Sequence, residues 1–99
     1  HPMTITIQNR LATFLAGQER HIEAVPLFEE IVGYRIDSLS LDNALTLRTI
    51  AALGESLRGA GRCDEVVDWS ERALPPARSL LEADDAILVT IQTNHAACQ

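Results

Sequence analysis

Residues 23–32 read EAVPLFEEIV, and residues 65–74, which lie 42 positions further along the chain, read EVVDWSERAL. Within residues 11–29 alone, comparing the chain with itself at this offset aligns seven identical pairs, whose first members are Leu11, Leu15, Gly17, Arg20, Glu23, Val25 and Glu29. A fixed period of this length is typical of a repeat architecture, in which one supersecondary unit stacks on the next. The sequence therefore predicts a single domain, 1–99, with units at about 1–41, 42–83 and 84–99, the last of them incomplete.

Each unit is predicted to be a pair of helices, because its apolar residues recur at three- and four-residue steps, as they do on one face of a helix. In the second unit this stripe consists of Leu47, Ile50, Leu53, Gly54 and Leu57. Glycines at positions 59 and 61 then mark the helix end. No stretch alternates with the period of two that a half-buried strand requires. The fold class is therefore all-α, with five helices at about 3–17, 20–38, 43–59, 62–82 and 85–98.

Local features refine this prediction. Asp42 and Asp84 stand at matching positions and are expected to cap the helices that follow, since a carboxylate there can accept from free backbone N–H groups. Pro75 and Pro76 predict a kink or restart in the fourth helix, because proline removes a backbone donor and disfavours helical dihedrals just before it. The predicted buried core is Leu11, Leu15, Ala24, Phe28, Leu53, Gly54, Leu57, Val66 and Trp69.

The composition argues against several classes of function. The net charge of −6 disfavours nucleic acid, which is bound through basic side chains, and anionic membranes. No apolar run approaches the roughly 20 residues of a membrane span. Cys63 and Cys98 are too few and too isolated for a disulfide framework, so a reducing compartment and a cytoplasmic location are expected. Both ends of the chain read as cuts through a longer protein.

These stretches resemble the tetratricopeptide repeat family. Residues 23–32 match its pattern of Glu-Ala, an aliphatic residue and then an aromatic, here Phe28, whereas residues 65–74 keep the glutamate and the Arg-Ala-Leu ending. The period of 42 and the connector HPMTI at residues 1–5 are similar to the longer variant of kinesin light chains and many bacterial regulatory proteins. The resemblance implies a right-handed solenoid of stacked antiparallel helix pairs, about two and a half repeats long.

No constellation of side chains supports an enzyme or a cofactor. His95 and Cys98 lie one helical turn apart, but a zinc site needs four ligands, or three and a water, and no second pair has ligand spacing. Acidic pairs such as Asp84 and Asp85 stand near helix N-termini, where the helix dipole favours negative charge. We therefore expect no catalysis, no bound metal and no cofactor.

The resemblance implies a non-catalytic interaction module, whose first helices line a groove that holds a peptide or a segment of a partner protein. Carried over position by position, the groove residues are Thr6, Asn9, Thr13, Arg48, Glu55, Arg58, Thr90 and Thr93. The helical period supports this set, because 6, 9 and 13 share one face, as do 48, 55 and 58. The two arginines suit bidentate pairing with a carboxylate. A solvated helix face is the alternative for each residue.

A second interpretation is architectural: the chain would be a self-association segment of a larger regulatory protein, pairing through its open ends. Ile87, Leu88 and Ile91 predict an apolar stripe on the last helix, exposed if no further helix covers it. A homodimer through that helix would follow. Peptide binding in the groove, or a mass that depends on concentration, would separate the two interpretations.

Overall fold

A computed structural model describes residues 2–99, apart from the side chain of Pro2. It contains the helices α1 (Pro2–Gly17), α2 (His21–Leu39), α3 (Ala44–Gly59), α4 (Cys63–Leu80) and α5 (Ala86–Cys98). No strand occurs in this range, so the prediction of an all-α fold with five helices is confirmed. None of these helices is both long enough and apolar enough to cross a membrane.

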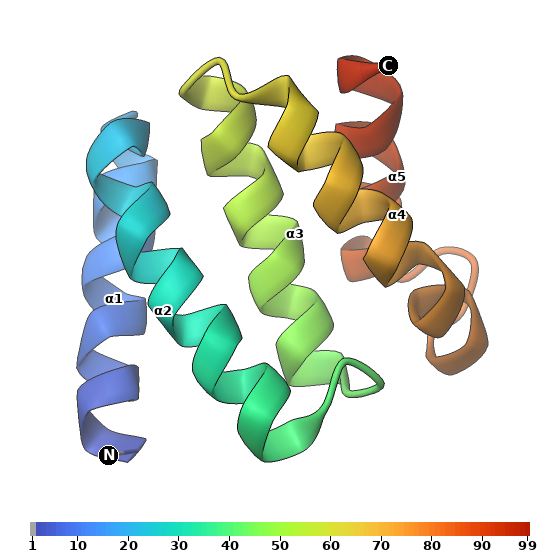
Figure 1. Cartoon of the computed structure of the whole chain (residues 1–99), viewed down its shortest axis with the longest axis horizontal. Coiled ribbons are helices and arrows are strands. Elements are labelled where there is room, and N and C mark those ends of the chain that lie inside the picture. The colour runs from blue at the N-terminus through green and yellow to red at the C-terminus, as the bar shows by residue number, and fades with distance from the viewer. Residues whose placement is uncertain (1) are drawn as a thin grey trace.

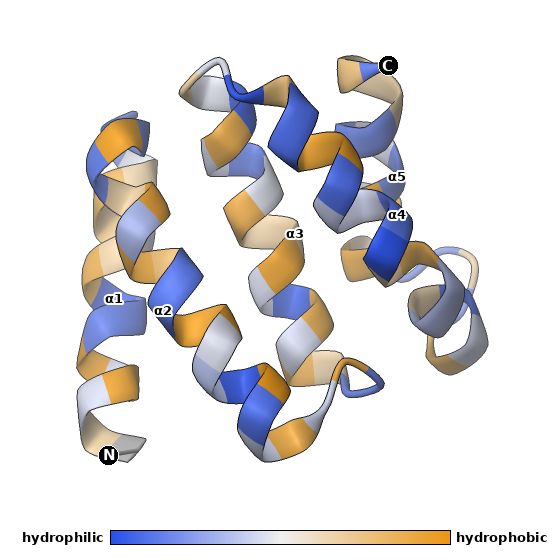
Figure 2. Cartoon of the chain, in the orientation of Figure 1, coloured by the Kyte–Doolittle hydropathy of each residue, from blue (hydrophilic) through white to orange (hydrophobic). Residues whose placement is uncertain are grey.

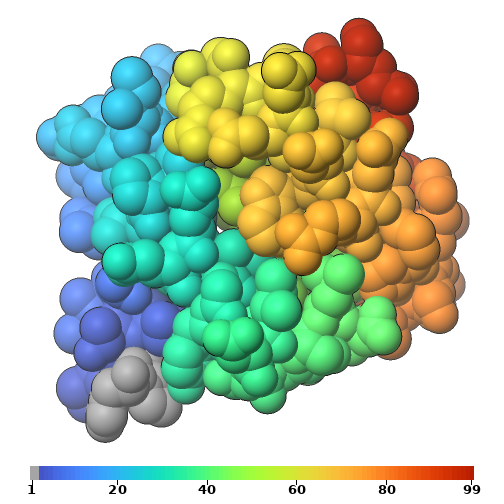
Figure 3. Space-filling view, in the orientation of Figure 1, coloured from blue at the N-terminus to red at the C-terminus, as the bar shows by residue number. Residues whose placement is uncertain are grey.

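The helices are arranged side by side around α3 (Figure 1). α1 packs on α2, α2 on α3, and α3 on α4, while α5 packs on both α4 and α3. In the view of Figure 1, α4 lies in front of α5, and the two chain ends lie at opposite corners. Side chains of α2 and α4 cover much of the face turned toward the reader (Figure 3). α3 therefore packs against three neighbouring helices.

One apolar core joins the five helices, and apolar residues alternate with hydrophilic ones along each of them (Figure 2). Seven residues of the predicted core are buried: Leu15, Ala24, Phe28, Leu53, Gly54, Leu57 and Val66. Trp69 is only half-buried. The prediction for Leu11 is wrong, because this side chain is 48% exposed and the next residue, Ala12, is the buried one.

The helix caps lie one residue later than predicted. Asn43 caps α3 and Asp85 caps α5, each accepting a hydrogen bond from the backbone N–H two residues further on, at 2.9 and 2.8 Å. The assignment of Asp42 and Asp84 as caps is therefore wrong. The backbone of Asn43 and of Asp85 is still extended, so each helix begins only after these residues. The side chains of Asn43 and Asp85 are therefore the ones that can reach the first free N–H groups.

α4 continues as one helix through Pro75 and Pro76, so the predicted restart is wrong. A proline cannot donate to the carbonyl four residues before it. Those carbonyls belong to Glu71 and Arg72, which are exposed residues, so water can bond to them instead. Ala77, directly after the prolines, is fully buried, and its packing holds the end of the helix on the core.

α5 crosses α3 at Gly54, where the side chain of Asn94 fills the space above the glycine. Asn94 is 1% exposed. Its Nδ2 donates to the carbonyl oxygen of Ala51 at 3.2 Å, and its Oδ1 accepts from the Arg58 guanidinium at 2.9 Å. A Cβ atom at position 54 would lie 2.6 Å from Nδ2 of Asn94. α3 and α5 therefore cross closely at Gly54.

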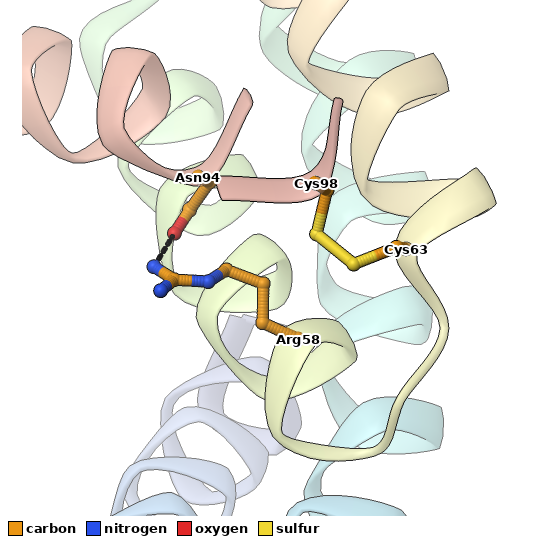
Figure 4. The surroundings of a disulfide bond; sticks show 4 residues. All are labelled: Arg58, Cys63, Asn94 and Cys98. Carbon is orange, nitrogen blue, oxygen red and sulfur yellow. Dashed lines mark hydrogen bonds between the residues drawn. A yellow bond between two sulfur atoms is a disulfide. The ribbon is translucent and has the colours of Figure 1, made fainter. Parts of the chain in front are cut away.

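A disulfide joins Cys63, the first residue of α4, to Cys98, the last residue of α5 (Figure 4). The two Cα atoms are 5.1 Å apart, although 35 positions separate the residues in sequence. The expectation that the two cysteines are isolated is therefore wrong. Antiparallel packing brings the start of one helix to the end of the next, which spacing along the chain does not reveal. The cysteines thus give no support to a reducing compartment.

Gly54→Ala should lower the free energy of unfolding by about 1–3 kcal/mol, because the added methyl group must displace a buried side chain. Gly33→Ala is the matched control, since nothing lies within 4 Å of a Cβ at that exposed site in α2. There the change should be neutral or stabilising by about 0.5–1 kcal/mol, the usual helical preference for alanine. Urea unfolding followed by circular dichroism measures both. Equal effects at the two sites would contradict the close crossing.

Reducing the disulfide should lower the free energy of unfolding by about 2–4 kcal/mol, because the cross-link restricts the unfolded chain. The measurement is urea unfolding with and without dithiothreitol, after mass spectrometry has verified the oxidised state. A double variant, Cys63→Ser with Cys98→Ser, should be insensitive to the reductant. Two free thiols in protein purified without reductant would refute the cross-link.

Candidate binding groove

A groove runs from the space between α1 and α3, across α3, to the space between α3 and α5. It consists of four adjoining depressions of about 380, 340, 200 and 160 Å³. Ala52 lines the first three of them and Glu55 lines the last three, so their walls are continuous. We call this surface the groove.

The structure brings seven of the eight predicted groove residues to these walls: Asn9, Thr13, Arg48, Glu55, Arg58, Thr90 and Thr93. They come from α1, α3 and α5, because the first helix of each pair presents the same face. Thr6 is exposed on α1 but does not line any of the four depressions. That the other seven hold a peptide stays a prediction.

α2 also contributes to the groove, which the sequence comparison missed. Phe28 and Arg35 line its largest depression together with Thr49 of α3. The predicted groove residues all lie on the first helix of a pair, so the prediction includes no residue of a second helix. One signal was present: Arg35 lies one turn from Ile31 on the apolar stripe of α2, an unusual position for a charged side chain unless it has a polar partner.

Hydrogen bonds to α3 hold Arg35 in place. Its Nη1 donates to Oγ1 of Thr49 at 2.8 Å and to the backbone oxygen of Leu45 at 3.2 Å. Partial burial lowers the pKa of Arg35 from its ordinary value, and the nearby positive charge of Arg48 lowers it further. Two guanidinium groups therefore lie close together at one end of the groove.

The third arginine of the groove, Arg58, is held from α5. Figure 4 shows its guanidinium pointing to Asn94, whose Oδ1 accepts from Nη1 at 2.9 Å. The remaining donors of the guanidinium lie in the depression formed with Thr90 and Thr93. Since Asn94 is buried and bonded to α3, the position of this end of the groove depends on how α5 packs.

The predicted exposed stripe on α5 is not exposed. Leu88 and Ile91 are 3% and 1% exposed, and Ile87 is half-buried. The expectation of an open apolar face at Ile87, Leu88 and Ile91 is therefore wrong, because these residues pack into the core against α3 and α4. The large apolar residue of α5 that remains open to solvent is Val89, 44% exposed.

The paired positions of His95 and Cys98 do not form half of a metal site. Cys98 forms a disulfide with Cys63, and Nε2 of His95 lies 3.6 Å from a carboxylate oxygen of Glu71. Across residues 2–99, no group of three histidine, cysteine, aspartate or glutamate side chains is arranged to hold a metal ion.

Comparison with known proteins agrees with this architecture. A sequence model of the tetratricopeptide repeat family matches residues 3–79, which is more than half of the chain. A comparison with curated proteins gave no match. The matched segment spans α1 to α4 almost completely, and it includes both stretches on which the resemblance rests. The chain therefore belongs to the tetratricopeptide repeat family.

Proposed function

We propose that the groove binds an extended segment of a partner protein and that the chain acts without catalysis. Tetratricopeptide repeats generally mediate protein–protein interaction. The observation that carries the proposal is the continuity of the groove across three helices, from Asn9 on α1 to Thr93 on α5. A site shared by successive repeats suits a ligand that is long in one direction.

The form and lining of the groove favour a peptide over a compact small molecule. Small-molecule sites are mostly apolar and enclose much of their ligand, whereas these four depressions are open to solvent and have hydroxyl, amide and charged groups among the apolar ones on their walls. Asn9 offers both a donor and an acceptor, and the threonine hydroxyls do the same. Such groups can bond to the backbone N–H and C=O groups of an extended chain.

The spacing of the helices supports assignment to the longer variant that resembles kinesin light chains. α1, α3 and α5 begin at residues 2, 44 and 86, and α2 and α4 begin at 21 and 63, so equivalent helices start 42 residues apart. Equivalent ion pairs form at the starts of the second helices, between Arg20 and Glu23 and between Arg62 and Glu65.

Ala52→Trp should abolish peptide binding, because the indole would project into the groove from a wall that three of the four depressions share, without changing any charge. The assay selects displayed random dodecapeptides on the wild type and measures the affinity of the selected peptides for both proteins. Ala83→Trp, at an exposed position between α4 and α5, is the matched control and should bind normally. Circular dichroism checks that both variants are folded. Undiminished binding by a folded Ala52→Trp protein would place the peptide site elsewhere.

A specific observation favours self-association as a second function, through α1 and not α5. Ile7, Leu11 and Phe14 form a stripe on α1 and are 60%, 48% and 58% exposed. The residues 42 positions later on α3 are all buried: Thr49, Leu53 and Ser56. Thr49 and Ser56 contact α2. This face of a first helix is thus a packing face, and a second copy could cover it across a two-fold axis.

Ile7→Glu should prevent that association, because a charge would enter an apolar contact. Light scattering over a wide concentration range should give a mass approaching twice that of the monomer for the wild type, and the monomer mass for the variant. Leu80→Glu, at an exposed site on α4, is the control and should associate like the wild type. A wild-type chain that stays monomeric at every concentration rules out this second function.

A further inference from the structure

We infer that the groove is specific for acidic peptides: one carboxylate side chain binds between Arg35 and Arg48, and a second, four or five positions away, binds Arg58. This inference rests on the proposed function and adds the chemical class of the peptide and the spacing of its charges. It also involves Arg35 of α2, which is not one of the groove residues predicted on the first helices.

Arg35 and Arg48 lack a counter-charge. Both line the depression of about 380 Å³, whose other walls are Asn9, Thr13, Phe28, Thr49 and Ala52, and none of these is acidic. No ion pair of residues 2–99 involves either arginine. The lowered pKa of Arg35 reflects its burial and the charge of Arg48. A carboxylate between the two guanidinium groups would remove their repulsion and could accept hydrogen bonds from both.

Three of the other arginines of this chain have charged or aromatic partners. Arg20 and Arg62 form ion pairs with glutamates on their own helices. Arg72 lies over the ring of Trp69, with its Cζ atom 4.5 Å from the ring centre. With 14 acidic residues for 8 arginines in the chain, acidic partners are plentiful. Two adjacent arginines without one, inside a concavity, therefore point to a ligand that supplies the charge.

The groove and the whole chain carry net charges of opposite sign. Of the residues that line the four depressions, Arg35, Arg48 and Arg58 are cationic and Glu55 is anionic, which gives a net charge of +3 − 1 = +2. The chain as a whole carries −6. An acidic peptide is thus attracted to the groove and repelled elsewhere, an arrangement that raises specificity more than raw affinity.

Positions along α3 fix the spacing of the two acidic residues. Arg48 and Arg58 are ten residues apart, and at a rise of 1.5 Å per residue their Cα atoms lie about 15 Å apart along the axis. An extended chain covers about 3.3 Å per residue, so the same distance takes four or five residues. Glu55 lies between the two arginines and disfavours a third acidic residue there. Two separated sites also favour side chains over a terminal carboxylate, of which a peptide has only one.

The experiment uses random dodecapeptides displayed with a blocked C-terminus and selected on the intact chain. We expect pairs of Asp or Glu at positions i and i+4 or i+5 to be enriched over pairs at other spacings. Fluorescence anisotropy then measures the affinity of a selected peptide and of its single Glu→Gln or Asp→Asn versions. The protein variants are Arg48→Gln, Arg58→Gln and, as the control with the same loss of charge, Arg78→Gln at an exposed site on α4.

Arg48→Gln and Arg58→Gln should each weaken binding by about tenfold, the usual effect of losing one charge-assisted hydrogen bond. Arg78→Gln should change the affinity less than twofold. When one of these arginines is replaced, neutralising the acidic residue that it binds should not weaken binding further. Neutralising the other acidic residue should still weaken binding. Arg35→Lys, which keeps the charge but not the geometry of the guanidinium, should weaken binding through the same acidic residue as Arg48→Gln.

The outcomes separate this inference from the proposed function. If peptides are selected and Ala52→Trp blocks them, but acidic pairs are not enriched or the arginine variants bind normally, the acidic specificity is wrong and the peptide groove stands. If peptides bind but Ala52→Trp does not block them, or if no peptide is selected at all, both the acidic specificity and the proposed peptide groove are wrong. An equal loss for Arg48→Gln and Arg78→Gln would mean that only the overall charge matters, which also overturns the inference.

Discussion

α3 has to pack against α2, α4 and α5 while leaving one side open, and this requirement governs the rest of the structure. Small residues on α3 make the close contacts possible. Gly54 admits Asn94 from α5, and Gly59 admits the ring of His21, whose Cδ2 atom would lie 2.1 Å from a Cβ at that position. Close packing leaves few alternatives once these contacts form, because larger side chains would have to move backbone or buried groups.

The same helix therefore separates core from groove. Leu47, Leu53 and Leu57 are fully buried on one side of α3, and Arg48 and Glu55 are exposed on another. The boundary between these sides is polar and hydrogen-bonded: Thr49 accepts from Arg35. Buried polar groups lose free energy unless they are paired. Arg35 and Arg58 are consequently held by contacts that also join α2 and α5 to α3.

The disulfide and the Asn94 contact both act on α5, at different places. The cross-link holds its last residue to the start of α4, and Asn94, one turn earlier, bonds to α3 (Figure 4). α5 is the shortest helix, with 13 residues. An isolated helix of that length is marginal in water, so tertiary contacts must stabilise it. Since α5 supplies Thr90 and Thr93 to the groove, those contacts also keep the groove complete.

The amino-acid sequence by itself determined the helices, their pairing into repeats and the face of the first helices that lines the groove. Each of these follows from periodicity, since residues three or four apart share a helix face whatever surrounds it. What covers each face was decided only by the tertiary structure. Leu11 and Leu53 are equivalent in the repeat, yet one is exposed and the other buried, because α2 covers α3 and does not cover that side of α1. The disulfide, the buried stripe of α5 and the approach of Arg35 to Arg48 depend on distances between helices, which the period of a single helix does not contain.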